Sequence, residues 1–305
     1  MREIGDIIRR FEIGPDEPYA LATLVRAHGS SYRRPGARML IPASGDSVGS
    51  LSGGCLEEEV SAKGGEVIRT GKPAWMKFDT RRHFGCYGAI EIFIEPVRPA
   101  LLATLAEGSH TRRSVLIATV YSRDSAEAGS RLLHEFDDPP DTQDVLVQRV
   151  DPALELLVIG KGPDTVALHR FAGTLGWHVI AIESATEIRG QYDPWTAAII
   201  KTHNYGRDFA ALRALLPLGL PYIGLLGPRR RRDQLLADLL DIGVDVAENL
   251  FAPAGLDLGG DSPESIALAI IAEINAVFAG GSAQPLRGRR TPIHATSRAP
   301  LSVAR

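Results

Sequence analysis

This 305-residue chain has two cysteines, and each directly follows a glycine. Cys55 lies in Ser50–Glu57 (SLSGGCLE), which joins a predicted strand to a predicted helix. Backbone N–H groups in such a turn can form a concave site for an anion, and a helix N-terminus favours the thiolate form of a cysteine. The glutamates that follow oppose a thiolate, so a small buried thiol after a glycine turn is the alternative.

Cys86 lies far from Cys55 in the sequence, in His83–Gly88 (HFGCYG), just before a predicted strand. The two cysteines form no CxxC motif, and no pair of histidines lies near them, so their spacing is poor evidence for a metal site. A pair that the fold assembles to bind a soft metal or to handle sulfur remains open. Two cysteines are too few for a disulfide framework, and such scarcity is typical of a reducing cytoplasm.

A second glycine turn, Gly160–Thr165 (GKGPDT), lies between a predicted buried strand and a predicted helix. Gly160 and Gly162 would let the backbone turn tightly and approach a pyrophosphate at the helix N-terminus. Glu183 ends the next predicted strand, where an acidic residue can bind a ribose 2′-hydroxyl. Thr165 replaces the third glycine of the dinucleotide fingerprint, so the turn indicates either NAD(P) binding or a degenerate turn kept for the fold.

Basic residues and a histidine follow the predicted strands of the second half. Arg229–Arg232 open a predicted helix, where four positive charges are unfavourable unless an anion binds; a solvated helix end is the alternative. His203 follows a strand at its carboxyl end, the side where open α/β sheets bind ligands. It is either a catalytic acid or base, or a positioning residue. In the first half, a further candidate anion contact is formed by Arg33, Arg34 and Arg38.

Short strands separated by glycine and proline dominate the first half. The β-rich segments that predict strands are Tyr19–Val25, Arg38–Ile41, Ser47–Leu51, Trp75–Phe78, Ala89–Val97 and Arg113–Tyr121. A helix is predicted for Leu56–Arg69, because Glu57–Glu59 in its first turn suit the helix dipole. The polar, proline-broken segment Asp137–Asp144 is typical of a boundary region, and we place a mixed α+β domain at residues 1–150.

The second half alternates apolar strands with helices. The predicted strands are Leu154–Ile159, His178–Ile182, Ala197–Lys201 and Tyr222–Leu226, and the predicted helices are Pro163–Leu175, Phe209–Leu216, Arg229–Asp241 and Pro263–Phe278. This alternation predicts right-handed βαβ units and a Rossmann-like, doubly wound parallel sheet, and hence an α/β fold class. We expect this domain to span residues 151–280 and a flexible tail to span residues 281–305.

The composition narrows the class of protein. Charged residues make up 23% and hydrophobic residues 44% of the chain, as in ordinary soluble globular proteins. The formal net charge of −3 disfavours a nucleic-acid partner, because such a partner usually selects a basic face. No apolar stretch approaches the roughly 20 residues that cross a bilayer, and the N-terminal segment lacks the features of a secretory signal. We therefore expect a cytoplasmic protein without a membrane span.

Taken together, these motifs resemble the XdhC/CoxI family, the accessory proteins that mature xanthine dehydrogenase and related molybdenum hydroxylases. The similar segments follow the family order; they are Ala22–Ile41, Gly49–Val60, Phe84–Val97, Leu156–Thr165, Lys201–Asp208, Pro221–Leu236, Ala252–Ile274 and Thr291–His294. The stretches SGGCLE and APAGLDLGGDSPESIALAI are the most specific. The sequence departs from the family at Thr165, at Glu183 and at Asn204, where an aspartate is usual.

The resemblance implies that the protein binds the molybdenum cofactor (molybdopterin), assists its sulfuration with a cysteine desulfurase, and delivers it to an apo-enzyme similar to xanthine dehydrogenase. It also implies a homodimer that acts as a chaperone rather than as an enzyme, with no catalytic residue assigned. An NAD(P)-dependent oxidoreductase is the alternative function. The residues that we expect to contact a cofactor are Ser52, Gly53, Gly54, Cys55, Glu57, Cys86, Gly160, Gly162, Glu183, His203, Arg229 and Arg230.

Overall fold

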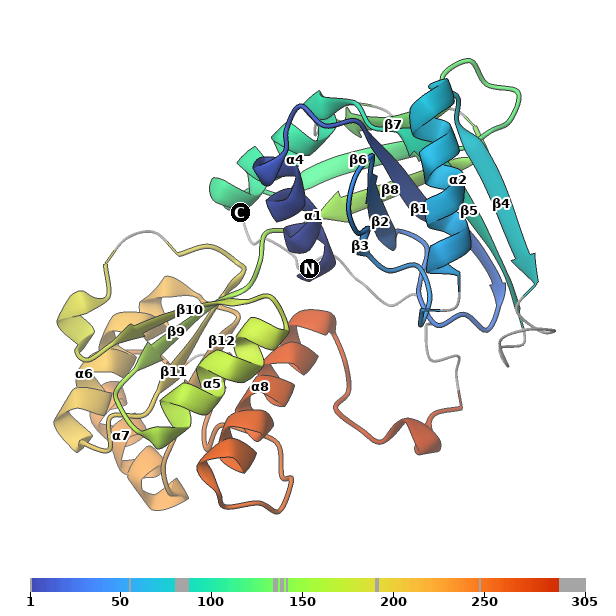
Figure 1. Ribbon diagram of the computed structural model, residues 1–305. Coiled ribbons are helices and arrows are strands. Elements are labelled where there is room, and N and C mark those ends of the chain that lie inside the picture. Colours follow the sequence, from blue (N-terminus) through green and yellow to red (C-terminus); the bar gives the residue numbers. More distant parts are fainter. Residues whose placement is uncertain are drawn as a thin grey trace. The chain divides into compact units, whose positions relative to one another are not determined.

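The computed structural model describes residues 2–54, 56–79, 88–133, 137, 140, 142–189, 192–246 and 248–290. The chain divides into two compact units, Met1–Pro152 and Ala153–Arg305, which are built from different secondary structure (Figure 1). Each unit has hydrophobic cores of its own. In the described part of the chain, no helix is long and apolar enough to cross a membrane.

In its described residues, the first unit contains two antiparallel sheets and three helices. Its strands are β1 (Tyr19–Gly29), β2 (Arg38–Pro42), β3 (Val48–Gly49), β4 (Ala74–Asp79), β5 (Gly88–Pro96), β6 (Val115–Val120), β7 (Gly129–Leu133) and β8 (Val145–Val150). Its helices are α1 (Arg2–Ile13), α2 (Glu57–Thr70) and α4 (Pro99–His110). The larger sheet has the order β3-β2-β1-β5-β4, and the smaller one has the order β7-β6-β8.

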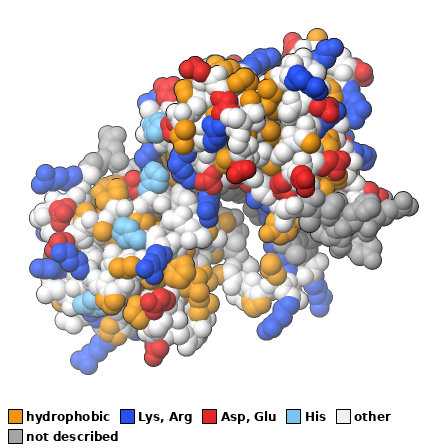
Figure 2. All heavy atoms as spheres, in the orientation of Figure 1, with side chains coloured by type: hydrophobic (Ala, Val, Ile, Leu, Met, Phe, Trp, Pro, Cys, Tyr) orange, Lys and Arg blue, Asp and Glu red, His pale blue; other side chains and the backbone are white. Residues whose placement is uncertain are grey.

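The larger sheet is covered on both faces. Helix α2 packs on one face, where Val60 contacts a cluster that includes Ala22 and Ile92. On the other face, α1, α4 and the smaller sheet form a second cluster that includes Leu102 and Ile117. Because both of its faces are covered, β1 is buried over most of its length. Acidic and basic side chains are interspersed over the surface of this unit that Figure 2 shows.

Buried polar side chains connect the two sheets of the first unit. The guanidinium of Arg38 on β2 donates to Thr119 Oγ1 on β6 at 3.5 Å. The hydroxyls of Thr119 and Ser130 are 2.8 Å apart, and Ser130 Oγ donates to Glu95 Oε1 at 2.5 Å. Burial lowers the pKa of Arg38 to about 10 and raises the pKa of Glu95, although Ser130 partly offsets the latter. Arg38 is only 1% exposed, so the expectation that it contacts an external anion is wrong.

The described residues of the second unit form one parallel sheet. Its strands are β9 (Glu155–Ile159), β10 (His178–Ile182), β11 (Thr196–Ile200), β12 (Tyr222–Leu225) and β13 (Leu250–Phe251). Its α-helices are α5 (Pro163–Thr174), α6 (Tyr205–Leu215), α7 (Arg229–Asp241) and α8 (Pro263–Ala279), and its short 3-10 helices are η1 (Ala185–Glu187), η2 (Leu216–Leu218) and η3 (Leu286–Gly288). The strand order is β10-β9-β11-β12-β13, and all neighbouring strands are parallel.

Helices cover both faces of the parallel sheet. On one face, Leu168 of α5 and Ile270 of α8 belong to a core cluster with Val158. On the other face, α6 and α7 contribute Leu212 and Leu235 to a second cluster. The predicted fold class, a Rossmann-like doubly wound sheet after a mixed α+β domain, is confirmed. The strand order changes direction between β9 and β11, and ligands of such sheets bind at the carboxyl ends of the strands at this point.

Several elements differ from the sequence-based expectation. Helices α1 and α4 and strands β7, β8 and β13 were not predicted. Helix α6 begins at Tyr205 rather than at Phe209, because Asn204 Oδ1 accepts a hydrogen bond from Arg207 N at 3.0 Å and caps the helix. Strand β8 follows Asp137–Asp144 and pairs with β6, so this polar segment connects two strands within the first unit.

Candidate functional site

The glycine turn between β3 and α2 encloses a carboxylate from its own chain. Glu57 Oε1 accepts hydrogen bonds from Ser50 Oγ at 2.9 Å and from the N–H groups of Leu51 at 3.1 Å and Ser52 at 2.8 Å. Glu57 Oε2 accepts from Ser52 Oγ at 2.7 Å and from Leu56 N at 3.1 Å. Burial opposes the charge of Glu57, but these hydrogen bonds outweigh it and lower its pKa to about 2. Backbone N–H groups of this turn therefore do converge on an anion, as expected, but the anion is the carboxylate of Glu57.

The tip of this turn, Gly53 and Gly54, is exposed. Gly54 has φ +104°, and a Cβ built on it would meet no atom within 4 Å; at Gly53 the nearest atom is a ring carbon of Tyr32 at 4.0 Å. Gly54 N donates weakly to Ser52 Oγ at 3.3 Å, and Gly53 N has no partner among the described residues. The main chain at the tip is therefore open to a ligand. Cys55 follows it directly and lies outside the described residues.

The sequence-based proposals for the second thiol are not addressed by the structure. Cys86 lies within residues 80–87, which are outside the described residues. Its expected position near Cys55 therefore stays a prediction. Among the side chains that the structure describes, no group of three or more His, Cys, Asp or Glu residues is arranged to hold a metal ion.

The glycine turn after β9 also holds a carboxylate. Asp164 lies in the first turn of α5, and its Oδ1 is 2.9 Å from Lys201 Nζ. Lys201 follows β11 and is completely buried, and its Nζ also donates to Thr165 Oγ1 at 3.0 Å. The threonine at the position of the third glycine therefore serves as a hydrogen-bond acceptor for a buried cation, which a glycine could not do.

Both glycines of this turn are required by the ion pair and the adjacent strand. Gly160 has φ +113°, and a Cβ there would lie 2.7 Å from the carbonyl oxygen of Lys201. Gly162 has φ +155°, and a Cβ there would lie 2.7 Å from Asp164 Oδ1. The carboxylate of Asp164 lies at the helix N-terminus, where the phosphates of a dinucleotide would bind. An acidic side chain of the protein, paired with Lys201, therefore already lies at this helix N-terminus.

Glu183 directly follows β10, at the carboxyl edge of the sheet. Its carboxylate forms an ion pair with Lys161, which lies in the turn after β9. Both side chains are mostly exposed, so the pair contributes little to stability, and a ligand hydroxyl could replace the lysine at low cost.

His203 lies in a strained backbone conformation after β11. Its φ is +54°, in the left-handed region that costs a non-glycine residue about 1–2 kcal/mol. The neighbouring residues hold it there: Thr202 Oγ1 donates to Asn204 O at 3.1 Å and accepts from Asn204 N at 3.2 Å. His203 itself is exposed. Strain of this kind, when the surrounding structure maintains it, is typical of ligand-binding positions.

The four arginines Arg229–Arg232 that begin α7 differ in their partners. Arg231 forms an ion pair with Asp208, which is completely buried and lies on α6. Arg232 lies 2.6 Å from the carboxylate of Asp233. These two cations are therefore compensated within the protein, although they lie at the positive end of a helix.

Arg229 and Arg230 are exposed, and neither has a partner in the part of the chain that the structure describes. The first turn of α7 contains no acidic residue. The turns that contain Gly160, His203 and Arg229 follow the neighbouring parallel strands β9, β11 and β12. The structure thus brings the candidates of the second half to one edge of one sheet, where two uncompensated cations follow β12 and a strained histidine follows the neighbouring strand β11.

Three residues of these sites do not stand out in the sequence as candidates: Asp164, Lys201 and Asp208. The sequence does contain one signal for the ion pair: Lys201 ends the apolar segment AAIIK and so follows a buried strand. A fully buried lysine is almost always paired with an acid. The identity of that acid follows only from the tertiary structure, since Asp164 is far away in the sequence.

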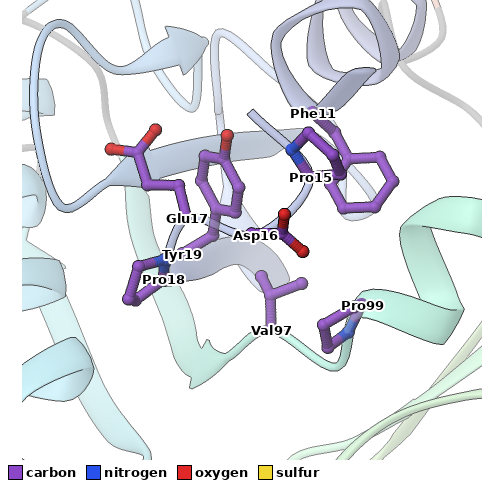
Figure 3. A pocket seen from close by; sticks show the side chains of 8 residues that line it. All are labelled: Phe11, Pro15, Asp16, Glu17, Pro18, Tyr19, Val97 and Pro99. Carbon is purple, nitrogen blue, oxygen red and sulfur yellow. The ribbon is translucent and has the colours of Figure 1, made fainter. Parts of the chain in front are cut away.

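A cavity of about 300 Å3 in the first unit lies between the turn after α1 and the start of α4. It is lined by prolines, Phe11, Tyr19 and Val97, with the carboxylate of Asp16 among them (Figure 3). The residues that line it include no lysine, arginine or histidine. Because the lining includes the carboxylates of Asp16 and Glu17 and no cation, it would repel an anionic cofactor, and this cavity is not a candidate site for one.

Comparisons with known proteins agree with both units. Residues 13–79 match the XdhC and CoxI family, and residues 156–274 match the XdhC Rossmann domain. The chain is 29% identical to a protein of Bacillus subtilis named as a probable xanthine dehydrogenase subunit, over 85% of this chain and 92% of that protein. It is 24% identical to the molybdenum cofactor insertion chaperone PaoD of Escherichia coli, over 84% of this chain and 82% of that protein.

A solved structure extends this similarity to the fold. A crystal structure described as a xanthine dehydrogenase from Bacillus halodurans has a TM-score of 0.76 and 26% sequence identity, and the match covers 94% of this chain and 99% of that one. The two family matches lie in different units and together include more than half of the chain. The chain belongs to the XdhC and CoxI family.

Proposed function

We propose that this protein binds the molybdenum cofactor and delivers it to an apo-enzyme of the xanthine dehydrogenase type. The names of two relatives support the proposal, since one is a molybdenum cofactor insertion chaperone and the other is a probable xanthine dehydrogenase subunit. The observation that carries it is the open main chain at Gly53 and Gly54, directly before Cys55 and fixed by Glu57. This turn lies within the residues that match the XdhC and CoxI family.

The turn suits a flat, charged cofactor for a physical reason. The carboxylate of Glu57 accepts hydrogen bonds from the N–H groups of Leu51, Ser52 and Leu56. These bonds fix the base of the turn even when no ligand is bound. The N–H of Gly53 has no partner among the described residues, and no side chain blocks the approach of a ring to the glycines. Cys55 would contribute a soft thiolate ligand. When bound, the cofactor supplies the molybdenum chemistry of the client enzyme, and the protein holds it without turnover.

In the second unit, we propose that Arg229 and Arg230 bind a phosphate of the cofactor and that His203 orients it. Both arginines are exposed and uncompensated, and an arginine matches a phosphate with two parallel donors. An NAD(P)-dependent oxidoreductase has less support, because the Asp164 carboxylate lies where a dinucleotide pyrophosphate would bind.

The proposal includes the biological setting that the family resemblance implies. We propose a homodimer that works in the cytoplasm, and a cysteine desulfurase that supplies sulfur to the bound cofactor. Cys55 and Cys86 are the two thiols that could take part in this transfer.

Activation of an apo-enzyme tests this function. Purified apo-xanthine dehydrogenase is mixed with free molybdenum cofactor, with and without this protein, and enzyme activity is followed in time. The proposal predicts faster or more complete activation with the wild-type protein, and a decrease of about tenfold in this effect for Cys55→Ala. Glu58→Gln, a change at an exposed position on α2, is the matched control and should behave as wild type. Equal activation with and without the protein would contradict the proposal.

A further inference from the structure

A second cavity of the first unit has a volume of about 330 Å3, which is enough for a small ring compound. Strands β1, β4 and β5 of the larger sheet line it on one side, and the turns next to β6 and β8 line it on the other. We call it the Trp75 pocket. The lining residues that matter here are Arg26, Trp75, Tyr121, Arg123, Asp124 and Asp144.

The aromatic wall of the Trp75 pocket is fixed by internal contacts. Trp75 Nε1 donates to the carbonyl oxygen of Tyr121 at 2.7 Å, so the indole on β4 is tied to the end of β6. The Trp75 ring also packs against Phe93, with ring centroids 5.3 Å apart, and Phe93 is completely buried. A ligand ring would therefore meet a preorganised surface and lose little affinity to side-chain ordering.

Each aromatic ring of this wall already has a guanidinium group over it. Arg26 Cζ is 5.4 Å from the centroid of Tyr121, and Arg123 Cζ is 5.7 Å from the ring centre of Trp75. Arg26 is held in place, because it donates to Asp144 at 2.9 Å and to the Tyr121 hydroxyl at 3.2 Å. Arg123 is exposed and has no ion-pair partner among the described residues, so it can leave the face of Trp75.

The carboxylate next to this face is available. Asp124 lines the pocket directly after Arg123, is exposed, and has no hydrogen-bond or ion-pair partner in the described part of the chain. The lining of the pocket therefore includes both a flat aromatic face and a free carboxylate. The pair Arg26 and Asp144 shows, in the same pocket, how a planar group with N–H donors satisfies both a ring and a carboxylate.

We propose that the Trp75 pocket binds a flat ring with an N–C(NH2)–N edge, as in the 2-amino-4-oxopyrimidine ring of guanine and of pterins. This edge has the planar shape and the parallel N–H donors of a guanidinium group, which stacks on aromatic rings and pairs with carboxylates. The ring takes the face of Trp75 that Arg123 now covers, and its donor edge bonds to Asp124. The inference rests on the proposed function only because a pterin is one of the two classes of compound that carry this edge; guanine compounds are the other.

Calorimetric titration of the full-length protein tests this inference with guanosine and neopterin as probes. We expect at least one of them to bind, and Asp124→Asn to weaken that binding by about tenfold, because the amide presents a donor where the ligand needs an acceptor. Glu127→Gln is the matched control, since Glu127 is exposed on the same turn and does not line the pocket. A Trp177→Phe/Trp195→Phe background leaves Trp75 as the only tryptophan, so its fluorescence should change on binding.

Two further probes decide whether the edge is recognised. Adenosine is equally flat but lacks the 2-amino edge, so it should bind much more weakly. N-acetylarginine amide represents the arginine of a partner protein. If guanosine binds and neopterin does not, the natural ligand of the pocket is a guanine nucleotide. If neopterin binds, alone or together with guanosine, the natural ligand is a pterin.

Three results would overturn the inference: no heat with either guanosine or neopterin, adenosine binding as tightly as they do, or binding of N-acetylarginine amide in their place. None of these bears on the proposed function, which depends on cofactor retention at Gly53 and Gly54. Conversely, a failure to retain or deliver the cofactor leaves binding of the isolated rings to the Trp75 pocket unaffected.

Discussion

Lys201 Nζ and Asp164 Oδ1 lie 2.9 Å apart inside the turn where a Rossmann fold usually accepts a phosphate. Both side chains are buried, and Thr165 completes the environment of the ammonium group. The first unit has a similar arrangement, since the carboxylate of Glu57 accepts hydrogen bonds from the N–H groups of its own glycine turn. In each unit, an acidic residue of the chain occupies a position that sequence motifs assign to an external anion.

The buried ion pair should be critical for the second unit. Lys201→Met leaves Asp164 as an uncompensated buried charge and should reduce the free energy of unfolding by about 3–5 kcal/mol. Adding Asp164→Asn to this variant removes that charge and should restore a large part of the loss. Urea unfolding followed by tryptophan fluorescence measures both. Lys161→Met, which breaks an exposed ion pair, is the control and should cost less than about 1 kcal/mol. A comparable loss in both lysine variants would show that burial of the pair does not matter.

Nicotinamide dinucleotides should not bind to the wild-type protein. The carboxylate of Asp164, paired with Lys201, already occupies the N-terminus of α5, where a pyrophosphate would bind. Calorimetric titrations with NAD, NADH, NADP and NADPH should therefore be flat. Micromolar binding that is lost when Gly162 is replaced by a bulky residue would contradict this and would restore the oxidoreductase alternative.

Glu57 should stabilise the first unit in a pH-dependent way. Its folded-state pKa of about 2 lies below the ordinary value of 4.5, so its stabilising effect is fully present above that value and is lost as the pH falls toward 2. Glu57→Gln should lower the free energy of unfolding at neutral pH, and the difference from wild type should shrink in acid. Denaturant titrations at several pH values measure this. The neighbouring Glu58→Gln, at an exposed position, should show neither effect.

Glu95 should have the opposite pH dependence. Burial raises its folded-state pKa above the ordinary 4.5, so its contribution to stability is greatest below that value and is lost as the pH rises through the raised pKa. Relative to Glu95→Gln, the wild-type protein should lose stability as the pH rises above the ordinary pKa of 4.5. Urea unfolding of both proteins across this range measures the difference. A constant difference would mean that Glu95 does not change its protonation on folding.

The sequence predicts the second unit better than the first for a physical reason. Strands β9, β11 and β12 lie in a parallel sheet between two helical layers, so they are continuous apolar runs that can be recognised locally. Strand β8 alternates half-buried and exposed residues after a proline-rich segment, and β13 has only two residues. Helix α1 has clear helical spacing, since it buries Ile7, Ile8 and Phe11 on one face, so its signal was present in the sequence although it was not predicted.

The positions of the candidate sites could be predicted from the sequence, but the contacts within these sites could not. The glycines at 53, 54, 160 and 162 mark the two turns, because their spacing between strand and helix is visible in the sequence. The partner of Lys201 depends on the pairing of β9 with β11, and the role of Glu57 depends on how the turn folds back over the start of α2. Neither can be deduced from spacing alone. The placement of Cys55 and Cys86 stays a prediction.

We propose that the protein carries a molybdopterin at the glycine turn before Cys55. The most direct measurement is mass spectrometry of the small molecules released from the purified protein after expression in a host that makes molybdopterin. We expect molybdopterin from the wild-type protein and from Glu58→Gln, and much less from Cys55→Ala. No pterin from the wild-type protein, a nicotinamide dinucleotide in its place, or equal amounts of pterin from Cys55→Ala and wild type would contradict it.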